Sequence, residues 1–321
     1  MDPSQTSGDS ELFRQRVKER SSPVPSIVLA IAGLVATGLA VHQVRESEEQ
    51  CLRERFARIV QADRSLIYSV VSRQESALFS LRLLFASSER ITRDEFRLAA
   101  KDLLAENRSI SALEWIPRVP DTDRRRFEEQ ARAEGATNFF ISDGGPGQPP
   151  VRAAERREHW PILYAEPLEG NSAALGYDLA GGPTVADIEA ARDTGQTRLT
   201  LPVKLRQEMT ERKSLIAILP VYAPNQSIET VEGRRTAFRG VVEGITRVDD
   251  FFTEVYEDRR DLPYALAVFL SDLTDGPVFE MGGSRWKAGS PIRVVEPLNI
   301  GQRGWRFEFE ATPEWVARGR S

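Results

Sequence analysis

Cysteine and histidine are almost absent from this chain of 321 residues, which contains one cysteine and two histidines. The single cysteine excludes an internal disulfide framework and any metal site that needs several cysteines. His42 lies in an apolar run, and His159 has no serine or cysteine beside it in a nucleophile motif, so we interpret His159 as structural. The sequence also lacks metal-ligand spacings and cofactor motifs. We therefore expect no enzymatic activity, no metal and no cofactor.

An excess of basic residues is absent as well, because 43 Lys and Arg face 48 Asp and Glu, for a formal net charge of -5. Binding to nucleic-acid phosphates depends on a dense basic face, so we expect no nucleic-acid partner. The cluster Arg124–Arg126 is then interpreted as a solvated helix face. The segment Gly144–Gly147 lacks the lysine and the following helix of a phosphate-binding loop.

Long apolar runs are missing except for one near the N-terminus. Residues 1–22 are polar, whereas Ile27–Val41 is almost wholly apolar and lies within residues 23–44, a segment without any charged residue. Because about 20 apolar residues cross a bilayer, we predict a tail over residues 1–22 and a transmembrane helix over residues 23–44. The alternative is a signal peptide, with the small residues Gly38 and Ala40 before its cleavage site. The long tail and the length of the run favour an uncleaved anchor.

Residues 45–92 are predicted to form a stalk helix, because Val44–Ser88 contains neither proline nor glycine. Apolar residues repeat in it at helical spacing: Leu52, Phe56, Ile59, Leu66, Ile67, Val70 and Val71. This stripe packs either on its own domain or on a second copy, which would make the protein a homodimer through the stalk, although a strict heptad is not obvious. Cys51 is taken as a free thiol, with an intermolecular disulfide as the alternative.

Beyond residue 92, helices and strands alternate, and from Tyr264 onward only strands and turns follow. Helices are predicted over residues 92–105, 122–133 and 184–194, with a short one after Asp249. Strands are predicted over residues 110–116, 138–141, 160–165, 198–205, 214–222, 238–248, 265–270, 277–281, 292–295 and 305–311. Ala223–Arg234 is interpreted as a polar loop. This order predicts an α+β protein with two subdomains on a long helix, residues 93–225 and residues 226–321.

The stretch His159–Leu205 and its surroundings contain an ordered series of short motifs. Within it lie a proline-led strand to Tyr164, Glu166-Pro167, a loop at Asn171, LGYD at Leu175–Asp178, ARDTG at Ala191–Gly195 and LTLP at Leu199–Pro202. Outside it lie ALEW at Ala112–Trp115, LPVY at Leu219–Tyr222 and FRG at Phe238–Gly240. Together these motifs resemble the CHASE domain, the extracytoplasmic sensory module of histidine kinases and nucleotide cyclases, including plant cytokinin receptors. The resemblance extends from about Leu83 to about Val255.

This resemblance implies a membrane-distal PAS-like lobe over residues 93–225 and a membrane-proximal PAS-like lobe over residues 226–321. It also implies that residues 45–321 are periplasmic or extracellular, that residues 23–44 span the inner membrane once, and that the tail is cytoplasmic. The flanking charges alone leave the orientation open, because the basic excess before the span disappears when the count extends to Arg64. The signal would pass through the stalk to an output of kinase or cyclase type that this sequence does not contain.

A small-molecule pocket needs apolar and aromatic walls with a few aimed polar groups. We expect such a cavity beside Thr200, formed by these candidates: Trp115, Tyr164, Glu166, Glu169, Leu175, Asp178 and Thr200. For the apolar candidates the alternative is plain core packing, and for Asp178 it is capping of the turn into Gly181-Gly182. Glu166 and Asp178 could also act as an acid and base pair, but nothing in their spacing requires it.

The resemblance to plant cytokinin receptors bears on two of these positions. In that family a threonine of the LT-x-P strand lies near the ligand, and Thr200 matches it. The family's aspartate that anchors the adenine ring lies in the loop after the Pro-hydrophobic strand, and here Glu166, Pro167 and Glu169 compete for its place. The identity of the ligand therefore stays open.

The sequence predicts a membrane-anchored sensor that binds a small molecule outside the cell and transmits a signal through its stalk helix. The alternative is a structural or adaptor protein of the envelope that contacts partner proteins without a small ligand. We further expect the chain to be either a fragment cut before a second span or a stand-alone sensor that signals through a partner.

Overall fold

The computed structural model describes residues 24–88, 90–144, 148–205, 213–257, 259, 261–273, 276–282, 290 and 292–320, with side chains from Ile27 onward. These residues belong to two compact units, one that ends at Arg55 and one that comprises Phe56–Gly319. Helix α2 (Val24–Ser87) is a single helix of 64 residues with parts in both units. No proline or glycine follows Gly38 in it, which allows the helix to continue without a break. The predicted long N-terminal helix is thus confirmed.

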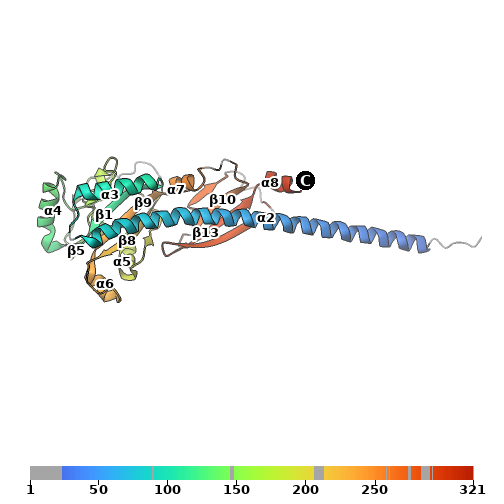
Figure 1. Ribbon diagram of the computed structural model, residues 1–321, viewed down its shortest axis with the longest axis horizontal. Helices are drawn as coiled ribbons and strands as arrows, with labels where there is room; N and C mark the ends of the chain where they lie inside the picture. The colour runs from blue at the N-terminus through green and yellow to red at the C-terminus, as the bar shows by residue number, and fades with distance from the viewer. Residues whose placement is uncertain are drawn as a thin grey trace, which may run out of the picture. The chain divides into compact units, whose positions relative to one another are not determined.

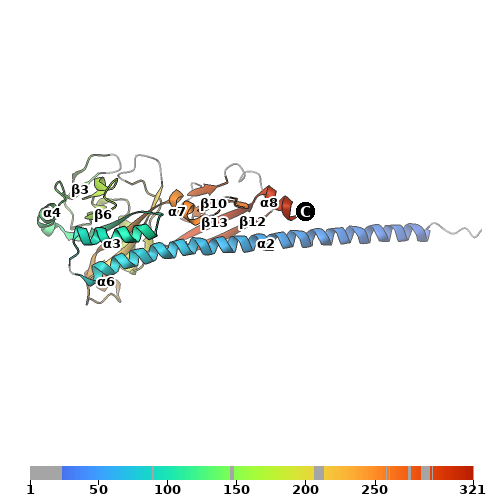
Figure 2. The same ribbon diagram turned by 45° about the horizontal axis from the view of Figure 1, so that its top comes forward.

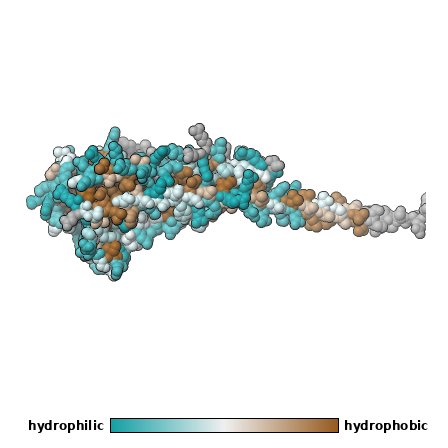
Figure 3. All heavy atoms as spheres, in the orientation of Figure 1, coloured by the Kyte–Doolittle hydropathy of each residue, from teal (hydrophilic) through white to brown (hydrophobic). Residues whose placement is uncertain are grey.

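In the first unit, α2 exposes a series of apolar side chains. Ile27, Val28, Leu29, Ile31, Leu34, Val35, Leu39, Val41 and Val44 are all solvent-exposed, and Figure 3 shows this part of the helix as an apolar surface. By length and composition, this is the one helix in the described residues that could cross a membrane. The N-terminal part of α2 is therefore a candidate membrane span.

The second unit contains a five-stranded antiparallel sheet. Its spatial order is β6 (Tyr164–Glu166), β1 (Ile110–Pro117), β9 (Phe238–Arg247), β8 (Ser214–Tyr222) and β7 (Arg198–Leu199). The β1, β8 and β9 segments are rich in Val, Ile and Leu and buried on both faces, as expected for strands with cover on each side. β9 is the central strand although it follows residue 225, so the sheet combines strands from both sides of that position.

Different helices cover the two faces of this sheet. On one face, α2 and α3 (Arg93–Glu106) pack side by side, as Figures 1 and 2 both show. Gly244 of β9 allows the close approach, because a Cβ there would lie 3.2 Å from Cδ2 of Leu78. On the other face lie α5 (Val185–Thr194), α6 (Val231–Ala237) and the chain around Trp160–Leu179. The sheet is thus the middle layer between a helical face and a mixed face.

A four-stranded antiparallel sheet follows in the same unit. Its order is β11 (Phe279–Met281), β10 (Tyr264–Leu270), β13 (Arg303–Ala311) and β12 (Arg293–Ile300). α7 (Val248–Val255) precedes it and α8 (Pro313–Gly319) follows it. Phe252 of α7 stacks on Phe279, with ring centroids 4.0 Å apart. Because α7 directly follows β9, this stack connects β9 of the five-stranded sheet to β11 of the four-stranded sheet.

From Phe56 onward, one face of α2 is buried against both sheets. Its buried residues recur every three or four positions: Phe56, Val60, Asp63, Ile67, Val70, Ala77, Leu78, Leu81 and Phe85. Phe56 meets Tyr264 of β10 and Trp315 of α8, whereas Leu78 and Phe85 belong to the core of the five-stranded sheet. Of the two interpretations of the stripe, packing on its own domain is therefore the one observed for these residues.

The remaining elements are short. They are α4 (Arg124–Ala133), the strand pairs β2 (Val119–Pro120) with β5 (Glu158–His159) and β3 (Ser142–Asp143) with β4 (Val151–Arg152), and the 3-10 turns η1 (Asp121–Asp123), η2 (Ser172–Ala174) and η3 (Leu179–Gly181). α4 and the chain around β3 and β4 contribute Ala131, Ile141 and Ala153 to the core beneath α2 and α3, whereas η2 and η3 contribute Ala174 and Leu179 to the core beneath α5. No sequence signal at the level of single residues predicted these pairs.

Most predicted elements are confirmed, and four are corrected. Residues 138–141 form no strand. The predicted strand 160–165 is observed only from Tyr164, where β6 begins and continues to Glu166. Of the predicted strand 198–205, only Arg198–Leu199 is in β7. The predicted loop Ala223–Arg234 contains the start of α6. In the three predicted strands, apolar residues such as Ile141, Ile162 and Leu205 are buried in irregular backbone, which local patterns do not report.

Candidate functional site

Strand β1 presents different chemistry to the two faces of the five-stranded sheet. Side chains alternate along a strand: Leu113 and Trp115 join the core beneath α2 and α3, while Ala112 and Ile116 join the core beneath α5. Glu114 stands between Ala112 and Ile116 on this second face. An acidic residue thus occupies the centre of an otherwise apolar layer.

Glu243 of β9 is the direct cross-strand neighbour of Glu114. Both side chains are almost fully buried, with 2% and 1% of the residue surface exposed. In each, Oε1 has no hydrogen-bond partner in the described part of the chain. Like charges directly opposite each other on neighbouring strands are destabilising, and a buried unpaired carboxylate is more so. This arrangement opposes folding unless protons or an added partner neutralise it.

The two carboxyl groups line a cavity of about 350 Å³. Its other lining residues are Ile162, Ala174, Tyr177, Leu179, Pro183, Thr184, Pro202, Val203, Lys204, Leu205, Ile216 and Ile245. Most are apolar, and Thr184 adds a buried hydroxyl, Oγ1, without a partner among the described residues. Pockets for small organic molecules have volumes of roughly 300–1,000 Å³ and combine such walls with few polar groups. The cavity therefore meets the size and chemistry of a ligand site.

Burial changes the acidity of both groups. Desolvation raises the pKa of Glu114 to about 8. Desolvation and the neighbouring Glu114 raise the pKa of Glu243 well above its ordinary value. Since the two groups interact, their protons dissociate in two steps that belong to the pair. At neutral pH the empty pair holds at least one proton.

Thr200, beside which we expect a cavity from the sequence, already uses its hydroxyl within the protein. Thr200 is fully buried, and its Oγ1 accepts a hydrogen bond of 3.1 Å from the backbone N–H of Ile216. Its backbone N–H donates to the carbonyl of Ile216 at 3.0 Å. Ile216 lines the cavity. Thr200 thus fixes a wall of the cavity from outside, and it is not among the lining residues.

Trp115 and Tyr164 lie on the opposite face of the sheet from this cavity. Trp115 stacks on Phe85 of α2. The hydroxyl of Tyr164 donates to the carbonyl of Ile91 at 3.0 Å, and it lies 3.1 Å from Oε2 of Glu134. Both side chains are buried in the core beneath α2 and α3. The structure does not bring them together with Thr200.

Asp178 is fully buried and holds together a network of charges. Its carboxylate lies 2.6 Å from Nδ1 of His159 and 2.9 Å from an Nη atom of Arg156, and it accepts from the backbone N–H groups of Trp160 and Ala180. Nε2 of His159 lies 2.8 Å from Oδ1 of Asp121. His159 therefore bridges the carboxylates of Asp178 and Asp121 through its two ring nitrogens. The capping alternative for Asp178 and the structural interpretation of His159 agree with this geometry.

The other three candidates lie in different surroundings. Leu175 is half-buried between the two cores, and Glu169 is exposed. Glu166 lines a separate open hollow of about 710 Å³ between α3 and the start of β1, together with Pro167 and the basic residues Arg97 and Lys101. None of the seven candidates is among the residues that line the cavity at Glu114 and Glu243.

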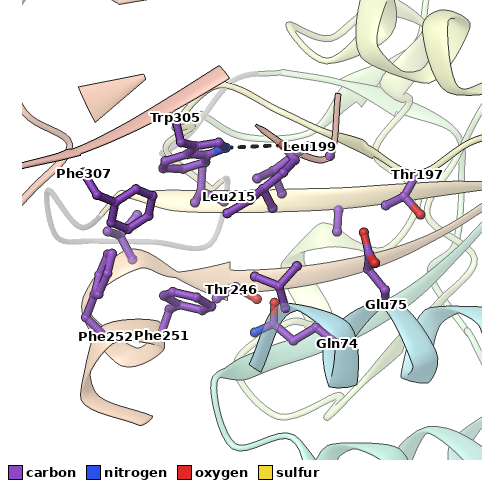
Figure 4. Close-up of a pocket in the computed structure, with 15 residues that line it drawn as sticks. Gln74, Glu75, Thr197, Leu199, Leu215, Thr246, Phe251, Phe252, Trp305 and Phe307 are labelled. Atoms are coloured by element: carbon purple, nitrogen blue, oxygen red, sulfur yellow. Dashed lines mark hydrogen bonds between the residues drawn. The ribbon is translucent and has the colours of Figure 1, made fainter. Parts of the chain in front are cut away.

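A further pocket lies where α2 and both sheets meet (Figure 4). Gln74 and Glu75 approach it from α2, Phe251 and Phe252 from α7, and Trp305 and Phe307 from β13. Its volume of about 60 Å³ leaves room for a few waters and for no organic ligand of ordinary size. We interpret this pocket as a packing defect between the two sheets. The cavity at Glu114 and Glu243 is the better candidate site.

Neither Glu114 nor Glu243 is among the site residues predicted from the sequence. A signal was present in ALEWI and VVEGI, where a single charged residue interrupts an apolar strand. Within the described residues, no group of three or more His, Cys, Asp or Glu side chains is arranged to hold a metal ion. The site as described is thus a pair of acids in an apolar cavity.

The chain is similar in sequence to a histidine kinase. Hybrid signal transduction histidine kinase A of Dictyostelium discoideum is 22% identical over 315 residues, in an alignment that covers 90% of this chain. The chain spans only 15% of that relative's length.

Two solved structures are similar to this chain at low sequence identity. The extracellular ligand binding receptor from Desulfohalobium retbaense is 12% identical, with a TM-score of 0.48 over 78% of this chain and 38% of that one. The ligand binding domain of the Pseudomonas aeruginosa amino acid chemoreceptor PctB, in complex with L-Arg, is 11% identical, with a TM-score of 0.46 over 82% of this chain and 96% of that one. Residues 89–279, more than half of the chain, match the CHASE domain, an extracytoplasmic sensor domain. The chain belongs to the CHASE domain family.

Proposed function

We propose that this chain is the sensor part of a membrane-anchored receptor and that a small molecule binds in the cavity over Glu114 and Glu243. The observation that supports the proposal is the pair of buried carboxyl groups with unpartnered oxygens in a cavity of ligand size. Buried polar groups are nearly always hydrogen-bonded, and exceptions call for an explanation. A ligand that supplies the missing partners is that explanation.

The signal would cross the sheet from the cavity to α2. Glu114 faces the cavity, while the next residue, Trp115, stacks on Phe85 of α2. A ligand that binds one position of β1 better than another shifts the population toward that position. Because the packed interface has few alternative arrangements, the shift moves α2 by sliding or rotation.

Further along, α2 contacts the second sheet. Asp63 of α2 accepts hydrogen bonds from Arg259 and from Tyr264 of β10, and Phe56 packs on the same tyrosine. We propose that the five-stranded sheet acts as a membrane-distal, PAS-like sensing lobe and the four-stranded sheet as a membrane-proximal one. The continuous helix would then pass the movement on toward residues 23–44.

Membrane anchoring belongs to the same proposal. The N-terminal part of α2 would span the inner membrane once, with residues 45–321 in the periplasm or outside the cell and residues 1–22 in the cytoplasm. The exposed apolar surface of this helix supports the span. The output would be a kinase or cyclase activity, as the name of the histidine kinase relative suggests.

We also propose that two copies pair along α2. Tyr68, Phe79 and Leu83 are exposed large apolar side chains on the face of α2 opposite its buried stripe, at 3.6 residues per turn. Light scattering of the chain in detergent should give a dimer, and Leu83→Glu should give a monomer. Leu98→Glu, at an exposed site of α3, is the control. A monomeric wild type at tens of micromolar concentration would exclude the pairing.

Ligand binding is tested by a thermal-shift screen of the chain in detergent against purines, amino acids, amines and small acids. A compound that binds only the folded protein raises the melting temperature. At a concentration of 100 times its Kd, it adds about 2.7 kcal/mol to the free energy of unfolding. Val203→Phe, which fills the cavity, should abolish the shift, whereas Val295→Phe at an exposed site of β12 should preserve it. If no compound stabilises the protein, and a stable partner protein is captured instead, an adaptor role replaces the sensor.

A further inference from the structure

Four other buried acids in the described residues are paired with arginine, and a fifth, Glu310, accepts a hydrogen bond from the backbone N–H of Ser290. Asp63 is paired with Arg259, Glu128 with Arg124, Asp178 with Arg156 and Glu308 with Arg293. These pairs offset the cost of removing a charge from water. Glu114 and Glu243 depart from this arrangement, because each is as deeply buried and each has an oxygen without a partner in the described part of the chain.

The lining of the cavity offers these acids little compensation. Besides the two glutamates, the titratable side chains that line it are those of Tyr177 and Lys204, and Lys204 is solvent-exposed. Thr184 begins α5 as its N-cap residue, yet its side chain makes no capping hydrogen bond, and its Oγ1 has no partner among the described residues. Three oxygens of residues that line one cavity therefore have no hydrogen-bond partner among the described residues and are available to a ligand.

Resting on the proposed function, we infer that the ligand is a small organic cation, a protonated amine or an amidinium, whose N–H groups bind between Glu114 and Glu243. Such a group supplies several donors and a positive charge, which are what two neighbouring carboxylates need. The apolar walls, among them Ile162, Ile216 and Ile245, would surround the hydrocarbon part of the ligand. A strong acid is excluded by repulsion from the same pair.

Binding of a cation changes the protonation of the pair. Without a ligand, the pair holds at least one proton at neutral pH, because burial raises both pKa values and the neighbouring Glu114 raises that of Glu243 further. A bound cation favours the ionised form, so its entry releases a proton to solvent. Affinity therefore increases with pH below the raised pKa, by up to about tenfold per pH unit when one proton is released.

A neutral ligand would behave in the opposite way. Protonated carboxyl groups donate hydrogen bonds, so a neutral acceptor molecule binds best when the pair is protonated. Its affinity would decrease as the pH rises through the pKa of the pair. The sign of the pH dependence thus distinguishes the two ligand classes without knowledge of the natural ligand.

The test uses the full chain in detergent and a panel of primary amines and amidines with 6–12 non-hydrogen atoms, each paired with its neutral isostere, such as 2-phenylethylamine with 2-phenylethanol. Calorimetry at pH 6.0, 7.0 and 8.0, in buffers of different ionisation heat, gives affinity and proton release together. We expect at least one cation to bind more tightly than its isostere, with a gain of several-fold per pH unit and release of about one proton at pH 7.0.

Isosteric variants assign the effect to the pair. Glu114→Gln and Glu243→Gln should each weaken cation binding at least tenfold and reduce proton release, whereas the control Glu280→Gln, at an exposed position of β11, should change neither. A different outcome would overturn the cationic class and keep the proposed sensor. In that outcome, binding of a ligand is abolished by Val203→Phe, but the ligand is neutral or its affinity is unchanged in both Gln variants. The absence of any cavity-dependent ligand among cations, neutral molecules and acids overturns the proposed function itself.

Discussion

Phe85 of α2 stacks on Trp115 of β1, with ring centroids 4.0 Å apart and ring planes 16° from parallel. Trp115 follows Glu114 in the strand, so neighbouring residues face the helix and the cavity. The same stack is therefore part of the core and a direct connection from the candidate site to α2.

Replacement of Phe85 by leucine should separate binding from transmission. Phe85→Leu removes the stack and costs roughly 1–2 kcal/mol of stability as a large-to-small core change, while ligand affinity should stay within about twofold. Hydrogen exchange measured with and without ligand should show ligand-dependent protection of residues 56–87 in the wild type and a smaller effect in the variant. Val295→Ala, at an exposed site of β12, should behave as wild type. Equal protection in Phe85→Leu would rule out this connection.

The empty protein should lose stability as the pH rises. The pKa of Glu114, about 8, and the strongly raised pKa of Glu243 exceed their values in the unfolded chain. The folded state then binds more protons than the unfolded state between about pH 4.5 and 8, so the free energy of unfolding decreases through that window. We expect the melting temperature to fall by several degrees from pH 5.5 to 8.5, at roughly 2–4 °C per kcal/mol.

Glutamine at either position should flatten this pH profile, since it is neutral in both states. Glu114→Gln and Glu243→Gln are therefore expected to be more stable than the wild type at pH 8.5, and Glu280→Gln is expected to follow the wild type. A wild-type melting temperature that rises over the same pH range would show that the pair is ionised and otherwise compensated.

Asp178 should be essential for folding and should affect ligand binding only indirectly. Asp178→Asn leaves Arg156 and His159 without their shared carboxylate, and removal of one partner from a buried charge network costs about 3–5 kcal/mol. Asp94→Asn, which breaks an exposed pair with Arg97, should cost less than about 1 kcal/mol. Urea unfolding measures both. If Asp178→Asn keeps wild-type stability and abolishes ligand binding, Asp178 is a ligand residue after all.

The contact between Asp63 and Tyr264 connects α2 to the second sheet. Tyr264→Phe removes one donor from a fully buried carboxylate whose pKa desolvation already raises. We expect a loss of about 1–3 kcal/mol, because a buried acceptor is left with fewer partners. Tyr68→Phe, on the exposed face of α2, should stay within about 0.5 kcal/mol. A loss at Tyr68 as large as that at Tyr264 would contradict this assignment.

Local patterns predicted those parts of the fold that depend on local chemistry. The capping box at Thr92 and Glu95 starts α3, Gly195 ends α5 in the left-handed conformation with φ 77°, and Ser214–Tyr222 is a strand with the predicted bounds. These features follow from propensity, capping and apolar runs. The pairing of β9 with β1 joins segments more than 100 positions apart along the chain, and no local pattern encodes it.

The site was harder to predict, because it depends on register. Glu114 and Glu243 are 129 positions apart in the sequence and meet only because β1 and β9 pair in one register. Strand alternation alone could have shown that Trp115 faces away from an acid at the preceding position. Asp178 was chosen for its motif, and the structure occupies its carboxylate with His159, Arg156 and two backbone N–H groups.

The central claim is that the cavity over Glu114 and Glu243 binds a small molecule. A crystal structure of the chain with the compound that gives the largest thermal shift tests it most directly. The account predicts electron density for that compound inside the cavity, with a donor group within hydrogen-bond distance of at least one of the two carboxylates. Density for the compound at another site, with the cavity empty or filled by side chains, would contradict the account.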